Sequence, residues 1–226
     1  MTPDRPAVDL VIFDCDGVLI DSEIIACSVA VATLAAHGLE IGLEEFLGFV
    51  GRSARDIRAL LERRFGALPA SWEAVQRETL FARFRSELKA MPGAAATVGS
   101  LGRPVCVASS SGHERLRLTL GAAGLHDLFA PAIFSATEVA RGKPAPDLFL
   151  HAAARMGAAP GRCLVVEDSP AGVTAAVAAG MRAIGFVGGS HCRPGHAERL
   201  RAAGAERVID RLPEVAALIR AGHAAA

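Results

Sequence analysis

The fold is decided by residues 8–22, which read VDLVIFDCDGVLIDS. The part from Val8 to Phe13 is short, apolar and rich in branched side chains, which is typical of a buried parallel strand. It runs directly into Asp14, Asp16 and Gly17, so the predicted strand ends in a loop with two carboxylates. In an open parallel sheet, ligands bind outside the carboxyl ends of the strands. This segment therefore predicts both a fold class and the place of a binding site.

Similar apolar runs recur along the chain and alternate with helical patterns. Further strands are predicted at residues 105–108, 132–134, 163–166, 183–186 and 208–209. Helices are predicted at residues 112–123, 146–156, 170–179 and 213–221. This alternation predicts an α/β fold, namely a Rossmann-like doubly wound parallel sheet with helices on both faces.

Residues 21–90 interrupt the alternation because they carry only helical patterns. The helices are expected at residues 22–37, 43–49, 53–65 and 71–88. A helical block directly after the first strand is most simply an inserted α-helical cap domain. We therefore expect a core of residues 1–20 and 91–226, with the cap at residues 21–90.

The composition argues against several classes of protein. No apolar stretch approaches the roughly 18 residues of a membrane span, so we expect no membrane partner. The formal net charge is zero and there is no basic run, which argues against nucleic acid. The five cysteines show no CxxC pairing and the N-terminus has no apolar signal segment, which favours a cytoplasmic location. We expect a monomer or a weak homodimer.

The pair Asp14 and Asp16 also indicates what chemistry the loop could perform. Clustered carboxylates supply the oxygen ligands that a hard divalent cation needs. Two neighbouring carboxylates also tend to differ in pKa, so one can serve as a nucleophile and the other as an acid or base. Gly17 lets the backbone turn sharply beside them. The alternative is a solvated loop at a strand end.

Residues 13–23, FDCDGVLIDSE, resemble the opening motif of the haloacid dehalogenase-like superfamily, and within it the branch of β-phosphoglucomutase and sugar-phosphate phosphatases. Three later segments extend the resemblance, at residues 105–112, 141–147 and 165–173. The resemblance implies a phosphatase in which Asp14 attacks phosphorus to give an aspartyl-phosphate. It also implies that Asp16 protonates the leaving oxygen and then activates water. True dehalogenases lack this second acid and are disfavoured.

The resemblance further implies a small phosphate ester as substrate, a sugar or sugar-acid phosphate, and Mg²⁺ as cofactor. Ser109 and Ser110 lie where hydroxyls and helix amides hold phosphate oxygens, although a simple helix N-cap would also explain that segment. Lys143 matches the lysine that neutralises phosphate and the attacking carboxylate. The chain has only two lysines, Lys89 and Lys143, which argues against an ordinary surface residue.

The last motif places two acids at a strand end. Asp168 is the expected metal ligand beside Asp14 and the backbone carbonyl of Asp16, and Glu167 is an outer ligand or an orienting group. Locally, Asp168 or Ser169 could instead only cap the following helix.

Three features bear on the choice of function. Arg52 in the predicted cap could bind a substrate phosphate or carboxylate, although a solvated arginine is an equal alternative. Ala26 occupies the place of a histidine in β-phosphoglucomutase-like enzymes, which favours a phosphatase over a phosphomutase. His191, Cys192 and His196 fit no standard zinc spacing, so a plain loop is expected there.

An alternative from another class is a non-enzymatic phospho-aspartate switch. Receiver domains also combine an acidic pocket, a hydroxyl and a lysine on a parallel sheet. Asp16 and the helical block both oppose this alternative, because a switch needs neither.

Overall fold

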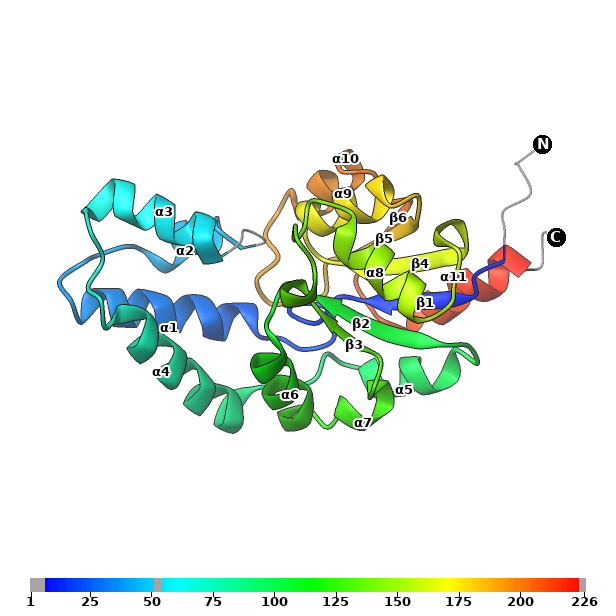
Figure 1. The fold of residues 1–226 in the computed structure, drawn as a ribbon, viewed down its shortest axis with the longest axis horizontal. Helices are drawn as coiled ribbons and strands as arrows, with labels where there is room; N and C mark the ends of the chain where they lie inside the picture. The colour runs from blue at the N-terminus through cyan, green and yellow to red at the C-terminus, as the bar shows by residue number, and fades with distance from the viewer. Residues whose placement is uncertain (1–6, 51–53, 224–226) are drawn as a thin grey trace.

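The computed structural model describes residues 7–50 and 54–223. Its centre is a six-stranded parallel sheet with the order β3-β2-β1-β4-β5-β6. The strands are β1 (Leu10–Phe13), β2 (Val105–Ser109), β3 (Ile133–Ser135), β4 (Cys163–Glu167), β5 (Arg182–Phe186) and β6 (Arg207–Ile209) (Figure 1). Each overlaps an apolar run that predicted a strand. The strand order reverses between β1 and β4, which is where open α/β sheets bind ligands.

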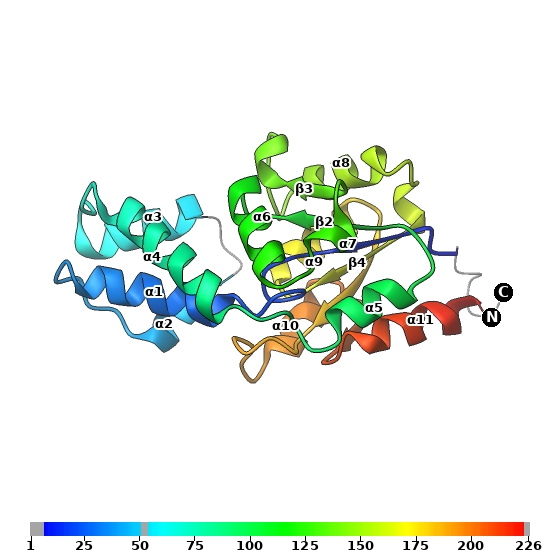
Figure 2. The ribbon, with the colours of Figure 1, turned by 90° about the horizontal axis from the view of Figure 1, so that it is seen from below.

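Helices cover both faces of this sheet, because alternate residues of each strand face opposite sides. Val11 and Phe13 belong to one hydrophobic cluster, whereas Leu10 and Ile12 belong to the other. The first cluster lies under α5 (Ala94–Ser100), α6 (His113–Ala122), α7 (His126–Phe129) and α11 (Pro213–His223). The second lies under α8 (Asp147–Arg155), α9 (Pro170–Ala178) and α10 (His196–Ala202) (Figures 1 and 2). The predicted doubly wound α/β fold is confirmed.

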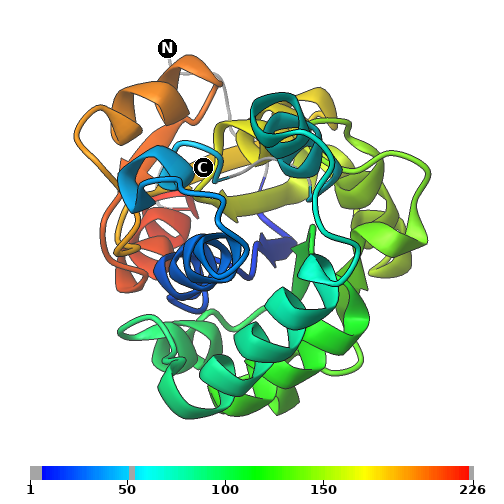
Figure 3. The ribbon, with the colours of Figure 1, turned by 90° about the vertical axis from the view of Figure 1, so that its left-hand side faces the viewer.

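The helical block after β1 lies to one side of the sheet. It consists of α1 (Glu23–Ala35), α2 (Leu43–Leu47), α3 (Ala54–Phe65) and α4 (Trp72–Glu87) (Figures 1 and 3). These helices share a hydrophobic cluster that includes Leu34, Phe46, Leu61 and Trp72. These four helices and their shared apolar cluster are what the predicted helical cap at residues 21–90 would contain.

Two connections join this block to the sheet and run side by side. Ile20 and Ala90 form an isolated antiparallel bridge, and the N–H of Met91 donates to the carbonyl of Leu19 at 2.8 Å. The predicted boundaries after residues 20 and 90 fall within this pair of connections. The division into two domains stays a prediction.

Three short helices of the core were not predicted, namely α5, α7 and α10. Helices of about a turn or two are too short to be stable alone, so packing decides whether they form. Val98 of α5, Phe129 of α7 and Leu200 of α10 are buried against the sheet. Among residues 7–50 and 54–223, no helix is long and apolar enough to span a membrane.

Candidate active site

Asp14 lies immediately after β1, at the carboxyl edge of the sheet. Its backbone N–H donates to the carbonyl of Val166 in β4 at 2.9 Å, and its side chain is buried. Lys143 Nζ donates to Asp14 Oδ1 at 2.6 Å, to Glu167 Oε1 at 2.6 Å and to the carbonyl of Ala108 at 3.1 Å. The Lys143 side chain is only 4% exposed. Lys143 is therefore an interior residue that joins three strand ends, and not a surface lysine.

Three buried carboxylates gather at this point. One ligand oxygen each from Asp14, Glu167 and Asp168 lies within 4.8 Å of the others. Burial first, and then the charges of Glu167 and Asp168, raise the pKa of Asp14 well above its ordinary value, although Lys143 opposes this. The group therefore carries more negative charge than its lysine offsets. A hard divalent cation with oxygen ligands fits such a group.

Glu167 is held from two sides. One oxygen accepts the ammonium of Lys143, and Oε2 accepts the N–H of Ser169 at 2.7 Å and its hydroxyl at 3.0 Å. The Ser169 hydroxyl in turn accepts the N–H of Gly172 at 3.0 Å and caps α9. A Cβ at Gly172 would lie 1.8 Å from Glu167 Oε1. Ser169 is thus a helix cap, as the local alternative proposed, and it also fixes Glu167.

Asp16 is not part of this acidic group. Its carboxylate accepts hydrogen bonds from the Ser22 hydroxyl at 2.7 Å, the Ser111 hydroxyl at 2.6 Å and the Arg115 guanidinium at 2.6 Å. Burial alone would raise the pKa of Asp16, but Arg115 and the two hydroxyls outweigh it and lower that pKa. The arrangement therefore holds Asp16 as a carboxylate.

The hydroxyl segment ends β2 beside Asp16. The Ser109 side chain is buried and its oxygen accepts the N–H of Ser111 at 3.0 Å, whereas Ser110 is exposed. Helix α6 has Gly112 at its N-cap, with no side-chain cap. The alternative in which a serine of this segment merely caps the helix is therefore wrong.

Gly17 allows the acidic loop to approach the end of β4. Its φ of 81° lies in the left-handed region, as the predicted sharp turn requires. A Cβ at this position would lie 1.9 Å from Asp168 Oδ2. Both the turn and the close packing therefore require glycine.

A cavity of about 710 Å³ lies between the strand ends and the helical block. Its lining includes Asp14, Asp16, Ser109, Ser110, Lys143, Glu167 and Asp168, which are all the predicted site residues except Arg52. Arg52 lies outside the described residues. Ala26 forms part of the wall where the mutase-like enzymes have histidine. The lining also contains Ser111 of the hydroxyl segment, and Glu23 and Arg115, to which the sequence assigned no role.

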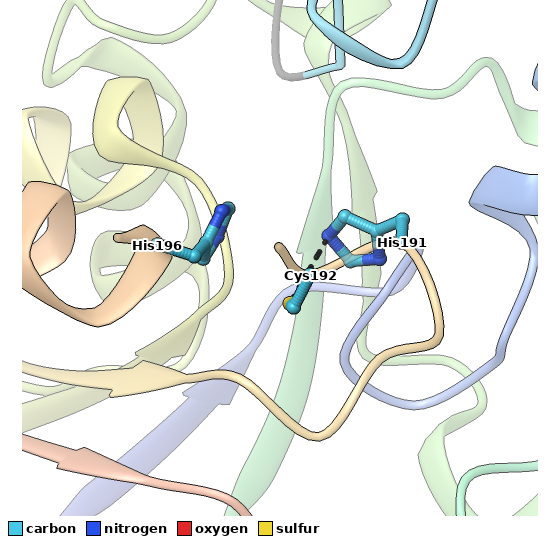
Figure 4. A group of neighbouring side chains, drawn as sticks. All are labelled: His191, Cys192 and His196. Atoms are coloured by element: carbon cyan, nitrogen blue, oxygen red, sulfur yellow. Dashed lines mark hydrogen bonds between the residues drawn. The ribbon is translucent and has the colours of Figure 1, made fainter. Parts of the chain in front are cut away.

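His191, Cys192 and His196 lie next to one another after β5, with one ligand atom of each within 4.8 Å of the others (Figure 4). Cys192 Sγ lies 3.6 Å from His191 Nε2, which is 3.0 Å from Asp168 Oδ2. His196 Nε2 donates to the carbonyl of Asp168 at 2.5 Å, while its Nδ1 faces Arg199 at 2.9 Å. Burial opposes the charged form of His191, but the hydrogen bond to Asp168 raises its pKa to about 11. The segment expected to be a plain loop therefore holds Asp168 in place through His191 and His196. The sequence did not show this, because Asp168 is distant from both histidines along the chain.

Comparisons with known proteins give the class of protein to which this fold and this strand-end site belong. The family model of the haloacid dehalogenase-like hydrolases matches residues 8–180. The 6-phosphogluconate phosphatase of Escherichia coli strain K12 is 33% identical over 190 residues, which cover 83% of this chain and 86% of that enzyme. The chain belongs to the haloacid dehalogenase-like hydrolase family and is a phosphoric monoester hydrolase.

Solved structures match over nearly the full length. A conserved haloacid dehalogenase-like protein from Agrobacterium tumefaciens strain C58 is 43% identical, with a TM-score of 0.85 over 95% of this chain and 99% of that one. A HAD family hydrolase from Deinococcus radiodurans R1, with bound phosphate and sodium, is 37% identical, with a TM-score of 0.80 over 97% and 98%. The resemblance stated from the sequence motifs is confirmed.

Proposed function

We propose that this hydrolase is a magnesium-dependent phosphatase that cleaves a small phosphorylated metabolite, a sugar or sugar-acid phosphate, through an aspartyl-phosphate at Asp14. The observation that carries the proposal is the buried contact of 2.6 Å between Asp14 and Lys143 on the cavity wall. An ammonium in this position can offset the charge of a bound phosphate and favours the ionised form of Asp14 that attacks.

The proposed reaction has two displacements at phosphorus. A carboxylate oxygen of Asp14 bonds to phosphorus while the ester P–O bond breaks, and Asp16 gives its proton to the leaving oxygen. In the second step Asp16 takes a proton from water while the water oxygen bonds to phosphorus. The P–O bond to Asp14 breaks, which regenerates the Asp14 carboxylate and releases inorganic phosphate. The contact of Asp16 with Arg115 suits this second, basic role, so Asp16 has to loosen that contact before it can act as the acid.

Other residues have binding roles in this proposal. Ser109, Ser110 and Lys143 hold phosphate oxygens, and Arg52 contacts the substrate from the helical block. Ala26 offers no base for transfer to a second hydroxyl, so water is the better supported acceptor than a sugar, as a phosphomutase would use. A phospho-aspartate switch is not favoured, because it has no need of a cavity of this size.

The acidic group fits Mg²⁺, because its carboxylates outnumber the cations that face them. Asp14, Asp168 and the backbone carbonyl of Asp16 would hold the ion, with Glu167 as an outer group. When bound, Mg²⁺ would neutralise phosphate charge and align the phosphoryl group.

A phosphate-ester screen tests this proposal. Inorganic phosphate release would be measured from hexose, pentose, hexitol and sugar-acid phosphates and from p-nitrophenyl phosphate, with Mg²⁺ or with a chelator. We expect Mg²⁺-dependent turnover of several esters and none in Asp14→Asn protein that remains folded. Turnover that survives in folded Asp14→Asn protein would refute the role of Asp14.

The place of action is part of the same proposal. All five cysteines are free, which supports a reducing, cytoplasmic location. We expect the enzyme to act on small phosphate esters as a monomer or a weak homodimer.

A further inference from the structure

Glu23 lies at the start of the helical block and on the wall of the cavity. It is the first residue of α1 and follows Ser22, whose hydroxyl donates to Asp16 at 2.7 Å. The Glu23 side chain is partly buried and lines the cavity together with Asp16 and Arg115. The geometry therefore presents a carboxylate next to the proposed acid and base.

Glu23 differs from the other carboxylates that line the cavity, because each of those has a cationic partner. The pairs are Asp14 and Glu167 with Lys143, Asp16 with Arg115, Asp168 with His191, Glu73 with Arg58, and Glu114 with Arg77. Within the part of the chain that the structure describes, the Glu23 carboxylate has no hydrogen bond and no ion pair. Burial first, and then the charge of Asp16, raise the pKa of Glu23 to about 7.

An unpaired carboxylate in a partly buried place is costly, so folded proteins rarely keep one without a use. Here the open hydrogen-bonding capacity faces a cavity large enough for a metabolite. The cations that line the described cavity wall, Lys143, Arg115 and Arg77, already face carboxylates. A ligand that donates a hydrogen bond would therefore satisfy Glu23, whereas a ligand carboxylate would be repelled by it.

The rest of the helical wall sharpens this choice. Several of its side chains are apolar, among them Phe49, Ile57 and Phe81. Glu23 is thus a polar contact in an otherwise largely apolar surface and adjoins Asp16, which would protonate the ester oxygen. A substrate hydroxyl that binds Glu23 would therefore be attached to a carbon atom close to the ester oxygen.

We propose that Glu23 selects the substrate by accepting a hydrogen bond from a hydroxyl of the leaving group close to the ester oxygen. The inference rests on the proposed phosphatase function and narrows its substrate class. The preferred substrates are neutral hydroxylated esters, which are sugar or polyol phosphates, and sugar-acid phosphates are disfavoured.

Steady-state kinetics of Glu23→Ala and Glu23→Gln protein test the inference. The substrates are a hexitol phosphate, 6-phosphogluconate and p-nitrophenyl phosphate, which has no hydroxyl to bind. We expect Glu23→Ala to lower kcat/KM for the hexitol phosphate by about 10- to 100-fold, and that for p-nitrophenyl phosphate by less than about threefold. Glu23→Gln keeps an acceptor oxygen, so it should recover part of the loss and improve the relative use of 6-phosphogluconate.

Glu73→Ala is the matched control, because Glu73 also lines the cavity but is well exposed and paired with Arg58. It should leave the ratios among the three substrates unchanged. An equal loss for all substrates in folded Glu23→Ala protein would overturn the inference, as would a wild-type preference for 6-phosphogluconate. If the wild-type enzyme cleaves p-nitrophenyl phosphate and no hydroxylated ester, this inference fails while the phosphatase proposal stands. If it cleaves no ester at all, the phosphatase proposal fails.

Discussion

Asp16 is held by donors from three parts of the chain: Ser22 before α1, Ser111 after β2 and Arg115 in α6. These contacts fix the carboxylate on the cavity wall, where it is not part of the acidic group of Asp14, Glu167 and Asp168. Proximity of a proton donor matters most when the leaving group is a poor one. The two proposed roles of Asp16 can therefore be separated by the choice of substrate.

Asp16→Ala protein should release a burst of about one nitrophenolate per enzyme from p-nitrophenyl phosphate and then stall. Nitrophenolate leaves without help, so the first displacement survives, whereas water is no longer activated in the second. With a sugar phosphate the same variant should show no burst. Rapid-mixing absorbance at the nitrophenolate band measures this. Steady turnover at the wild-type rate would exclude an acid or base role for Asp16.

Glu23 should lower the free energy of unfolding as the pH rises. Its folded pKa of about 7 lies above the ordinary value of 4.5, so the native state binds more protons between these pH values. Stability therefore falls as the pH rises through this window. Glu23→Gln removes the loss and should raise the free energy of unfolding by about 1 to 3 kcal/mol near pH 8, and by much less near pH 5. Urea denaturation of the metal-free protein measures both, and an equal gain at the two pH values would contradict the account.

The residues of the site differ in how far the sequence alone could predict them. That Asp14, Asp16, Lys143 and Asp168 would line one site could be predicted, because each lies in a motif at a strand end. Arg115 carries no comparable signal, since it is one of many arginines and reaches Asp16 only through the packing of α6. Ser111 and His191 were noted in the sequence, but their contacts with Asp16 and Asp168 could not be predicted because these partners are distant along the chain. Glu23 was assigned no role, because no partner for it is evident among the described residues.

At the scale of elements, two glycines set how closely the loops and helices of the site approach. Gly17 and Gly172 each lie where a Cβ would overlap a carboxylate oxygen, of Asp168 and Glu167 respectively. The sequence predicted the turn at Gly17, but the close contact with Asp168 depends on the neighbouring strand β4. Strands and long helices were predictable from periodicity, whereas α5, α7 and α10 depend on burial in the folded chain.

Gly17→Ala should displace Asp168 and strain the turn, with at least about a 100-fold loss of kcat/KM and weaker activation by Mg²⁺. Gly38→Ala is the matched control. Gly38 has a similar φ of 74°, but a Cβ there would meet nothing within 4 Å. It should lose roughly 1 to 2 kcal/mol of stability and keep its kcat/KM. Steady-state kinetics and thermal unfolding of both proteins measure this, and equal activity of the two would contradict the packing argument.

At the scale of the whole molecule, two ion pairs between described residues link the helical block to the core. Arg193, in the loop after β5, donates to Glu44 of α2 at 3.1 and 2.9 Å, and Arg77 of α4 lies 3.4 Å from Glu114 of α6. Both pairs are exposed, so they contribute little to stability. They can nevertheless bias how closely the block covers the site, as movable covers do in many enzymes.

Arg193→Gln should therefore raise the KM for a sugar phosphate while the Tm stays unchanged. Added salt should raise the wild-type KM in the same way and affect the variant less. Kinetics at low and high salt, together with thermal unfolding, measure these effects. A marked fall in Tm without a change in KM would mean that the Arg193–Glu44 pair stabilises the fold and does not affect how the helical block covers the site.

The central claim is covalent catalysis at Asp14, and the most direct measurement is to find the phosphoryl group on the chain. Asp16→Ala protein would be mixed with p-nitrophenyl phosphate and Mg²⁺, quenched in acid, digested and mapped by mass spectrometry. The account predicts one phosphorylated peptide, with the modification on Asp14, and none in the Asp14→Asn, Asp16→Ala double variant. A phosphoryl group on another residue, or a nitrophenolate burst with no labelled peptide, would contradict it.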